Sequence, residues 1–200
     1  MKIIEPSATL VDGIDPKEIL KKIELCGRVC YQSLPREDSA ENFVRMLIKR
    51  GHESVLEHVN LTFRIVCDRG VSHELVRHRI ASYSQESTRY VKYNSLKVVA
   101  PFDIDEDNPA HATWLRVMKT IENAYAFMIA NGIRPEIARS ILPNGLKSEL
   151  CMTANLREWR HILKLRTDKA AHPQMRQIAN QILDTFKKFL PVIVEDIDHA

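Results

Sequence analysis

The sequence lacks the features that would place the chain in a membrane or outside the cell. No apolar run approaches the roughly 18 residues that span a bilayer, and the segment Met1–Pro6 lacks the apolar core of a signal peptide. The four cysteines form no Cys-x-x-Cys pair, so zinc-ribbon and thioredoxin-type motifs are missing. Scattered thiols fit a reducing compartment. We therefore expect a cytoplasmic protein that does not bind membranes.

The sequence also lacks repeats, low-complexity tracts and a strong charge imbalance. The formal net charge of the 200 residues is only +3, which by itself does not predict binding to nucleic acid. Hydrophobic residues make up 44% of the chain and charged residues 28%, as in ordinary globular proteins. This composition predicts one domain over residues 1–200, large enough to bury a core without disulfides.

Capping residues and apolar periodicity predict more helix than strand. Proline, Asp and Asn at helix starts and Gly at helix ends mark the boundaries. The predicted helices span residues 16–32, 38–50, 71–80, 108–132, 135–142, 155–166 and 173–190. Alternating apolar residues predict strands over residues 59–67, 90–93, 96–99 and 146–153, and residues 82–88 form a polar loop. The predicted fold class is α+β.

The segment from Arg77 to Tyr90 concentrates groups that bind anions. Arg77, His78 and Arg79 are adjacent, and Ser87 and Arg89 follow the polar loop. Guanidinium forks match phosphate and carboxylate oxygens, so this segment predicts a site for a small phosphorylated anion. We expect a depressed pKa for His78, because cations flank it. No GxSxG motif surrounds Ser87, which indicates a binding role for it rather than a nucleophilic one.

The predicted helix that starts at Asn155 has a polar stripe. Arg157, His161 and Leu165 lie four residues apart on one face, whereas Trp159 and its apolar neighbours face the core. A helix N-terminus also attracts anions. This stripe is therefore free to face a ligand.

Two other classes of protein stay open from the residues alone. Histidines and carboxylates in residues 52–58 raise a metal hydrolase, but His52 and His58 lack the H-E-x-x-H spacing, and Ser54 with Glu57 fits a capping box. We predict no metal. Tyr83, Tyr90 and other tyrosines could stack on bases in a nucleic-acid-binding module, although acidic residues are spread throughout. A flavin spectrum, zinc content and salt-dependent DNA binding separate these alternatives.

Six segments in this order together resemble the flavin-dependent thymidylate synthases. The most specific is Arg77-His78-Arg79, followed after seven residues by Ser87 and then by Arg89. The segments cover nearly the whole chain and are 28–31, 51–58, 73–79, 87–90, 138–143 and 155–166.

This resemblance implies an enzyme, its cofactors and its assembly. The family methylates dUMP to dTMP for de novo dTMP biosynthesis, with methylenetetrahydrofolate as carbon donor and NADPH as reductant through FAD. Its members are homotetramers with active sites shared between subunits. The implied fold is an α/β-class domain with a curved antiparallel or mixed sheet flanked by helices. It implies no nucleic-acid partner.

The resemblance also implies roles for single residues. Arg166 matches the catalytic arginine that activates the uracil ring. The residues that match the dUMP site are Glu74, Leu75, Val76, Arg77, Gln85, Glu86, Ser87, Thr88, Arg89, Arg139 and Arg166. The residues that match the FAD site are Ser54, Arg77, His78, Arg79, Gln85, Asn155, Leu156, Arg157 and His161. The chain departs from many or some relatives at Glu74, Ser84, Gln85 and Ala170, where relatives carry Gln, Asn, Glu and His.

Overall fold

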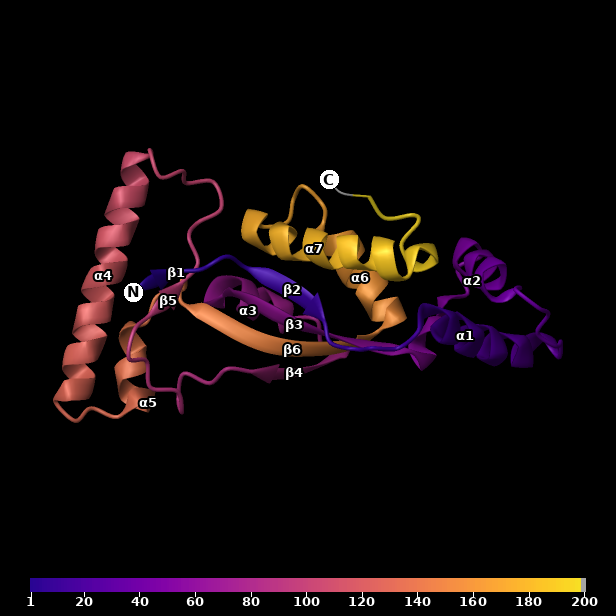
Figure 1. Cartoon of the computed structure of the whole chain (residues 1–200), viewed down its shortest axis with the longest axis horizontal. Coiled ribbons are helices and arrows are strands. Elements are labelled where there is room, and N and C mark those ends of the chain that lie inside the picture. Colours follow the sequence, from indigo (N-terminus) through magenta and orange to yellow (C-terminus); the bar gives the residue numbers. More distant parts are fainter. Residues whose placement is uncertain (199–200) are drawn as a thin grey trace. The chain divides into compact units, whose positions relative to one another are not determined.

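The computed structural model describes residues 1–198 and is a mixture of helices and strands (Figure 1). Within this range the α-helices are α1 Pro16–Tyr31, α2 Ala40–Lys49, α3 Arg69–Leu75, α4 Pro109–Ala130, α5 Pro135–Ala138, α6 Leu156–Arg166 and α7 Pro173–Phe189. The 3₁₀ helices are η1 Glu53–His58, η2 Arg139–Ile141 and η3 Pro191–Ile193. The strands are β1 Lys2–Ile3, β2 Ser7–Leu10, β3 Asn60–Asp68, β4 Ala81–Gln85, β5 Lys97–Val98 and β6 Lys147–Asn155. The α+β class is confirmed.

Local capping explains the helix starts that the sequence predicts well. The Asp15 side chain accepts a hydrogen bond from the Lys17 amide, and α4 has a similar cap at Asn108. The Asn155 side chain caps α6 by accepting from the Glu158 amide at 2.8 Å. Each cap satisfies an amide that has no partner within its helix, so a short sequence signal is enough to set these boundaries.

Several local predictions are wrong. The helix predicted to reach Ile80 ends at Leu75, and Ser39 rather than Asp38 precedes α2, because Asp38 has a left-handed backbone (φ 52°). Ser54 does not cap a helix, because it lies inside η1, which follows His52.

Strand predictions fail where pairing between distant segments decides the structure. The predicted loop over residues 82–88 overlaps β4, a polar edge strand whose partner β6 lies far along the chain. The predicted strand 90–93 is absent, since the Tyr90 and Val91 amides both donate to the Ser87 carbonyl and form a turn. The short strands β1 and β2 carry too little pattern to be predicted from sequence.

The main sheet has the strand order β2-β3-β6-β4, and β1 pairs in parallel with β5. Strands β3 and β6 are antiparallel within the second unit. The hydroxyls of Thr62 and Thr153 are hydrogen-bonded to each other, while Val59, three residues earlier, accepts from the amide of Leu156, three residues later. Alternate residues of β3, from Leu61 to Cys67, are at most 1% exposed, which confirms the predicted alternation.

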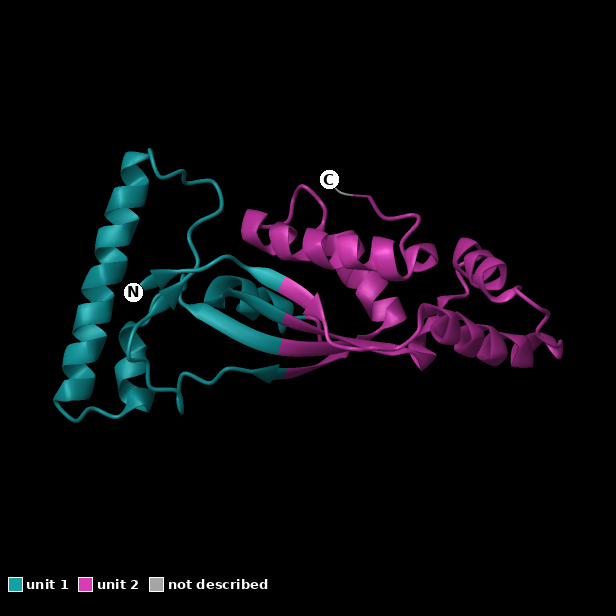
Figure 2. Ribbon diagram, in the orientation of Figure 1, with its two compact units in different colours: residues 1–7, 65–77, 84–150 teal, residues 8–64, 78–83, 151–200 magenta. Residues whose placement is uncertain are grey.

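The first unit comprises residues 1–7, 65–77 and 84–150 (teal in Figure 2). Its core includes Leu96, Val98 and Met118, with Trp114 packed against them. The Met1 ammonium forms an ion pair with Glu122 at 2.7 Å, which fixes the first residue beside α4.

The second unit comprises residues 8–64, 78–83 and 151–200, of which the last two are not described (magenta in Figure 2). The rings of Phe63, Trp159 and Phe186 pack together, with centroids 5.0–6.3 Å apart. The Trp159 indole also donates to the Leu61 carbonyl at 3.0 Å. The buried face of α6 therefore anchors this helix and turns its polar stripe outward. Across residues 1–198, no helix has the length and apolar character to cross a bilayer.

Candidate active site

An arginine-lined cleft of about 290 Å³ lies in the first unit. Seven side chains line it, and four of them belong to the continuous segment 85–88. The full set is Arg69, His73, Gln85, Glu86, Ser87, Thr88 and Arg139. Two cations and several neutral donors therefore surround a space that suits a small anion.

A half-buried polar network supports the turn around Ser87. The Glu86 amide donates to the Glu149 carbonyl at 2.8 Å, and the Glu86 carboxylate accepts from Lys147 at 2.5 Å and from the Tyr93 hydroxyl at 2.8 Å. Burial and the adjacent Glu86 raise the pKa of Tyr93, so its hydroxyl stays a donor. The Ser87 hydroxyl accepts from the Arg89 amide at 3.3 Å. This network fixes the backbone that presents Ser87 and Thr88.

The arginines beside this turn keep access to solvent. Arg139 extends from η2 and donates to the Thr88 hydroxyl at 3.5 Å. The Arg89 side chain is 58% exposed and lies 3.4 Å from the Glu136 carboxylate. Both cations are thus placed at the turn without being neutralised in the interior, which suits binding of a mobile phosphorylated ligand.

Gln85 has a structural role in the first unit. Its amide nitrogen donates to the hydroxyls of Ser72 at 3.0 Å and Ser148 at 2.9 Å, and both serines are buried. A glutamate at this position could not donate those two bonds. Nearby, the Leu75 side chain is fully buried, so any contact of Leu75 with a nucleotide must use its backbone, whereas Val76 and Arg77 are exposed.

A second polar cluster lies in the second unit around His78. The Arg166 Nε donates to His78 Nε2 at 3.1 Å, and the other ring nitrogen, Nδ1, lies 3.6 Å from Glu158 Oε1. The His161 ring packs edge-on with its centroid 6.1 Å from that of His78. The Tyr83 hydroxyl donates to the His78 carbonyl at 2.7 Å and fixes its backbone.

The environment of His78 keeps its imidazole neutral. Burial, the Arg166 guanidinium and His161 together lower the pKa of His78 to about 4. The predicted direction is confirmed, but the predicted cause is wrong, because Arg77 and Arg79 are exposed and the charges that act on the ring come from α6.

We expect His78 to stay neutral through the mildly acidic range. A histidine with an unperturbed pKa near 6.5 becomes mostly charged by pH 5, whereas His78 should not. Because the folded-state pKa is lowered, the folded protein should lose stability as pH falls from about 6.5 towards 4. An NMR titration of ¹⁵N-histidine-labelled protein from pH 8 to 5, with the His78 signal assigned by His78→Gln, measures this. A His78 midpoint above pH 6 would contradict the expectation.

The FAD-matching residues of the second unit that face solvent are Ser54, Arg79, Arg157 and His161, and Asn155 is half-buried. Arg157 donates to Glu57 at 2.6 Å across the exposed surface. The side chain of Leu156 is fully buried and can offer only backbone groups. The predicted polar stripe on α6 is confirmed.

Sequence reasoning gave no site role to Glu158 or Arg69. Glu158 is 8% exposed and faces His78, which precedes it by 80 positions, so no local motif links them. Arg69 lines the cleft and lies 3.4 Å from His73, one helical turn away. Their i, i+4 spacing is the one signal that could have placed Arg69 beside His73.

Exposed guanidinium groups such as those of Arg89 and Arg139 suit recognition of phosphorylated ligands. The family model described as thymidylate synthase complementing protein matches residues 9–192 of this chain. Proteins named flavin-dependent thymidylate synthase are 33% identical in Mycobacterium avium (89% of this chain, 79% of the relative) and 38% identical in Pyrococcus furiosus (76% and 64%). The chain therefore belongs to this family, that of the flavin-dependent thymidylate synthases.

A solved structure shares the fold. The crystal structure of a UMP/dUMP methylase, PolB from Streptomyces cacaoi, bound with 5-Br dUMP, superposes with a TM-score of 0.78. The two chains are 24% identical, and the match covers 98% of this chain and 96% of that one.

Proposed function

We propose that this protein catalyses the reductive methylation of dUMP to dTMP. Methylenetetrahydrofolate supplies the carbon, and NADPH supplies the two electrons that convert a methylene to a methyl group. The observation that carries the proposal is the cleft formed by Ser87, Thr88 and Arg139, in a chain that the family model matches over residues 9–192.

The residues of the second unit fit FAD by their chemistry. Arg79 and Arg157 are exposed guanidinium groups that suit a pyrophosphate, and the N-terminus of α6 adds a favourable dipole. His161 and the exposed Leu165 offer an aromatic and an apolar surface on the same stripe. When bound, FAD carries the hydride between NADPH and the transferred carbon. The protein supplies binding and orientation, with Ser54, Arg77, His78, Gln85, Asn155 and Leu156 completing the proposed contacts.

The cleft of the first unit is the proposed dUMP phosphate site. Arg139 and the Ser87–Thr88 turn line it, and Arg89 follows directly. A dianionic phosphate would be held by guanidinium forks and by the Ser87 and Thr88 hydroxyls. Glu86 shapes the turn, and the remaining proposed dUMP contacts are Glu74, Leu75, Val76, Arg77 and Gln85.

Arg166 is the proposed catalytic residue. Uracil C5 is a weak nucleophile, and its reaction builds negative charge on the ring nitrogen and oxygens. A guanidinium beside those atoms stabilises that charge in the transition state. Neutral His78 accepts from the Arg166 Nε at 3.1 Å and so sets the direction of the fork without adding a competing positive charge.

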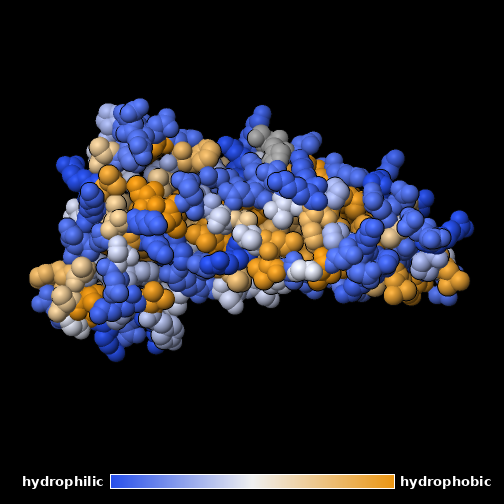
Figure 3. Space-filling model, viewed as in Figure 1, coloured by the Kyte–Doolittle hydropathy of each residue, from blue (hydrophilic) through white to orange (hydrophobic). Residues whose placement is uncertain are grey.

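The proposed assembly is a cytoplasmic homotetramer in which residues 1–200 act as one catalytic domain. Exposed apolar side chains support association: Leu25 and Val29 share one face of α1 and are 60% and 65% exposed. Figure 3 shows hydrophobic atoms at the surface over the stretch where α1 lies. Free thiols among the described residues suit a reducing compartment. Light scattering tests the assembly, and an active monomer of 23.0 kDa would contradict it.

Flavin retention tests the cofactor proposal. The protein is purified, loaded with saturating FAD, freed of excess FAD and examined by visible absorption. We expect a yellow protein with about one FAD for each chain and dTMP formation that depends on it. A protein that retains no flavin and instead retains zinc would support the metal hydrolase alternative.

We expect Ser87→Ala to keep measurable dTMP formation. The Ser87 hydroxyl bonds the Arg89 amide, and no histidine or carboxylate among residues 1–198 forms a hydrogen bond with it, so the role is binding. The KM for dUMP should rise, because one phosphate donor is lost, while kcat changes less. Steady-state kinetics with Ser82→Ala, an exposed serine of the same segment, as control measures this. Complete loss of turnover with intact dUMP and FAD binding would instead indicate a nucleophile.

A further inference from the structure

The two side chains on either side of the His78 ring, Arg166 and Glu158, favour the same tautomer of its imidazole. Its Nε2 accepts a hydrogen bond from the Arg166 Nε, and an arginine has no lone pair to offer in return. A neutral imidazole that accepts at Nε2 must carry its proton at Nδ1. Glu158 Oε1 lies 3.6 Å from this Nδ1.

Glu158 is placed to favour this tautomer. It is 8% exposed, and its backbone amide is fixed by the Asn155 cap, so its side chain starts from a rigid helical turn. A separation of 3.6 Å is longer than a hydrogen bond, so the carboxylate acts on the Nδ1–H mainly through its charge. In a buried setting, such a charge acts strongly on a nearby dipole.

We infer that Glu158 is a positioning residue, whose carboxylate holds His78 in the Nδ1–H tautomer and thereby keeps the Nε2 lone pair available to orient Arg166. The inference rests on the proposed role of Arg166 in dUMP methylation. The effect of Glu158 on the guanidinium passes through the ring of His78, whose two nitrogens face the two side chains.

A metal site is the rival use of these side chains. The ligand atoms of His78, Glu158 and His161 lie within 4.8 Å of one another. The His78 nitrogen beside Glu158 is Nδ1, and a metal bound there would put the ring proton on Nε2, where it would face the Arg166 Nε–H donor. A metal at Nε2 would need the lone pair that accepts from Arg166, and it would lie beside a guanidinium cation. The geometry therefore favours the hydrogen-bonded arrangement over a metal.

The tautomer is tested by ¹⁵N NMR of histidine-labelled, FAD-loaded protein at pH 8. In the wild type, His78 should show a protonated Nδ1 and an unprotonated Nε2. Glu158→Met, which keeps the length of the side chain and removes its oxygens, should give a mixture of tautomers. Glu158→Gln, which keeps an oxygen acceptor, should restore part of the wild-type pattern. Lys164→Met on the same helix is the control, since the Lys164 ammonium binds Asp196 rather than the His78 cluster.

Kinetics provide the second arm. Glu158→Met should lower kcat for dTMP formation by about 10-fold and leave the affinities for FAD and dUMP nearly unchanged. In an Arg166→Ala background, Glu158→Met should lower kcat little further, because the guanidinium that Glu158 helps to orient is already absent. A merely structural role for Glu158 would instead give additive losses together with a lowered melting temperature.

The outcomes are distinguishable. A Glu158→Met enzyme with an unchanged His78 tautomer, or with wild-type kcat, would overturn the inference. One zinc ion retained by each wild-type chain would overturn it as well. Wild-type protein that makes no dTMP under any condition would overturn the proposed function, and the NMR arm would still report whether Glu158 sets the tautomer.

Discussion

Arg166→Ala should cripple dTMP formation while NADPH oxidation by the FAD-loaded protein survives. The proposed role of Arg166 is to stabilise charge that develops on the uracil ring, and that charge is absent when NADPH alone reacts. Removing a preorganised donor of this kind costs about 10²–10³ in rate. Stopped-flow assays that follow NADPH consumption and dTMP formation separately measure the two activities.

Arg166→Lys is the matched variant. Lysine keeps the positive charge but lacks the planar fork, and its ammonium cannot donate from an Nε position to His78 as the guanidinium does. We therefore expect only slight recovery of rate over Arg166→Ala. If Arg166→Ala converts dUMP at nearly the wild-type rate, Arg166 is not the activating residue.

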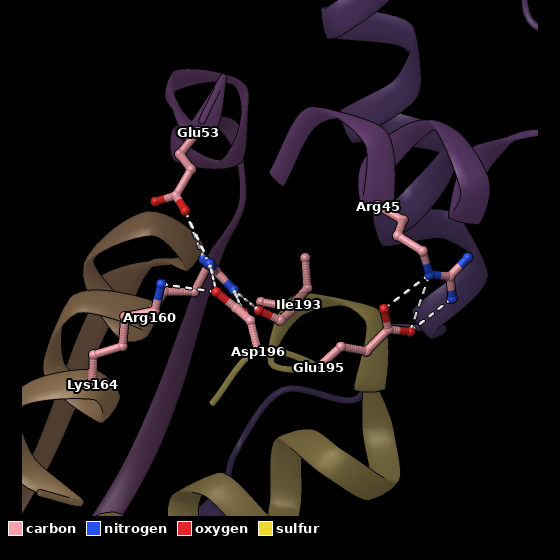
Figure 4. Close-up of polar contacts among 7 residues, drawn as sticks. All are labelled: Arg45, Glu53, Arg160, Lys164, Ile193, Glu195 and Asp196. Carbon is pink, nitrogen blue, oxygen red and sulfur yellow. Dashed lines mark hydrogen bonds and ion pairs between the residues drawn. The ribbon is translucent and has the colours of Figure 1, made fainter. Parts of the chain in front are cut away.

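We expect Arg160→Met to lower the free energy of unfolding strongly. Among single substitutions on the surface of α6 that faces the C-terminal segment, it should have the largest effect. Figure 4 shows the Arg160 guanidinium between carboxylates from two segments. It binds Asp196 through two bonds of 2.7 and 2.9 Å and Glu53 at 2.9 Å, and it also donates to the Ile193 carbonyl. These bonds hold the Asp196 pKa well below its usual range.

The expected loss follows from burial. Arg160 is 1% exposed, and the methionine would leave its buried acceptor, the Ile193 carbonyl, without that donor. Breaking a buried ion pair costs about 3–5 kcal/mol, and partial exposure of Glu53 and Asp196 places this case at the lower end. Urea unfolding at one fixed protein concentration measures the free energy of unfolding.

Arg45→Met is the control for Arg160→Met. Arg45 also binds a carboxylate of the C-terminal segment, Glu195, through bonds of 2.7 and 2.8 Å, but in an exposed position (Figure 4). Water and salt screen such pairs, so the midpoint of unfolding should hardly move. Equal losses from the two substitutions would show that burial of Arg160 does not set its contribution.

Sequence predicted those parts of the fold whose causes are local. The caps at Asp15, Asn108 and Asn155 lie within three residues of the amides that they satisfy. In β3, the alternating apolar residues themselves indicate which face of the strand is buried. In contrast, β4 is polar and depends on pairing with β6, which lies more than 60 residues away. The strand propensity of a segment does not indicate which distant segment it pairs with.

The same limit applies to the candidate site. The anion-binding character of Ser87 and the arginines around it follows from their chemistry, and their placement around one cleft required the structure. The low pKa of His78 was predicted from its neighbours in sequence, whereas its causes are burial and charged groups on α6. The sequence does not predict a role for Glu158, because tertiary contacts and not sequence spacing bring it beside His78.

The central claim is tested most directly by the stoichiometry of one anaerobic reaction. FAD-loaded protein is mixed with limiting NADPH, excess dUMP and excess methylenetetrahydrofolate, and NADPH consumed and dTMP formed are both quantified. Without oxygen as a competing electron acceptor, we expect one dTMP for each NADPH, and no dTMP when FAD, dUMP or the folate is omitted. NADPH consumption without dTMP, or dTMP formation by protein free of FAD, would contradict the account.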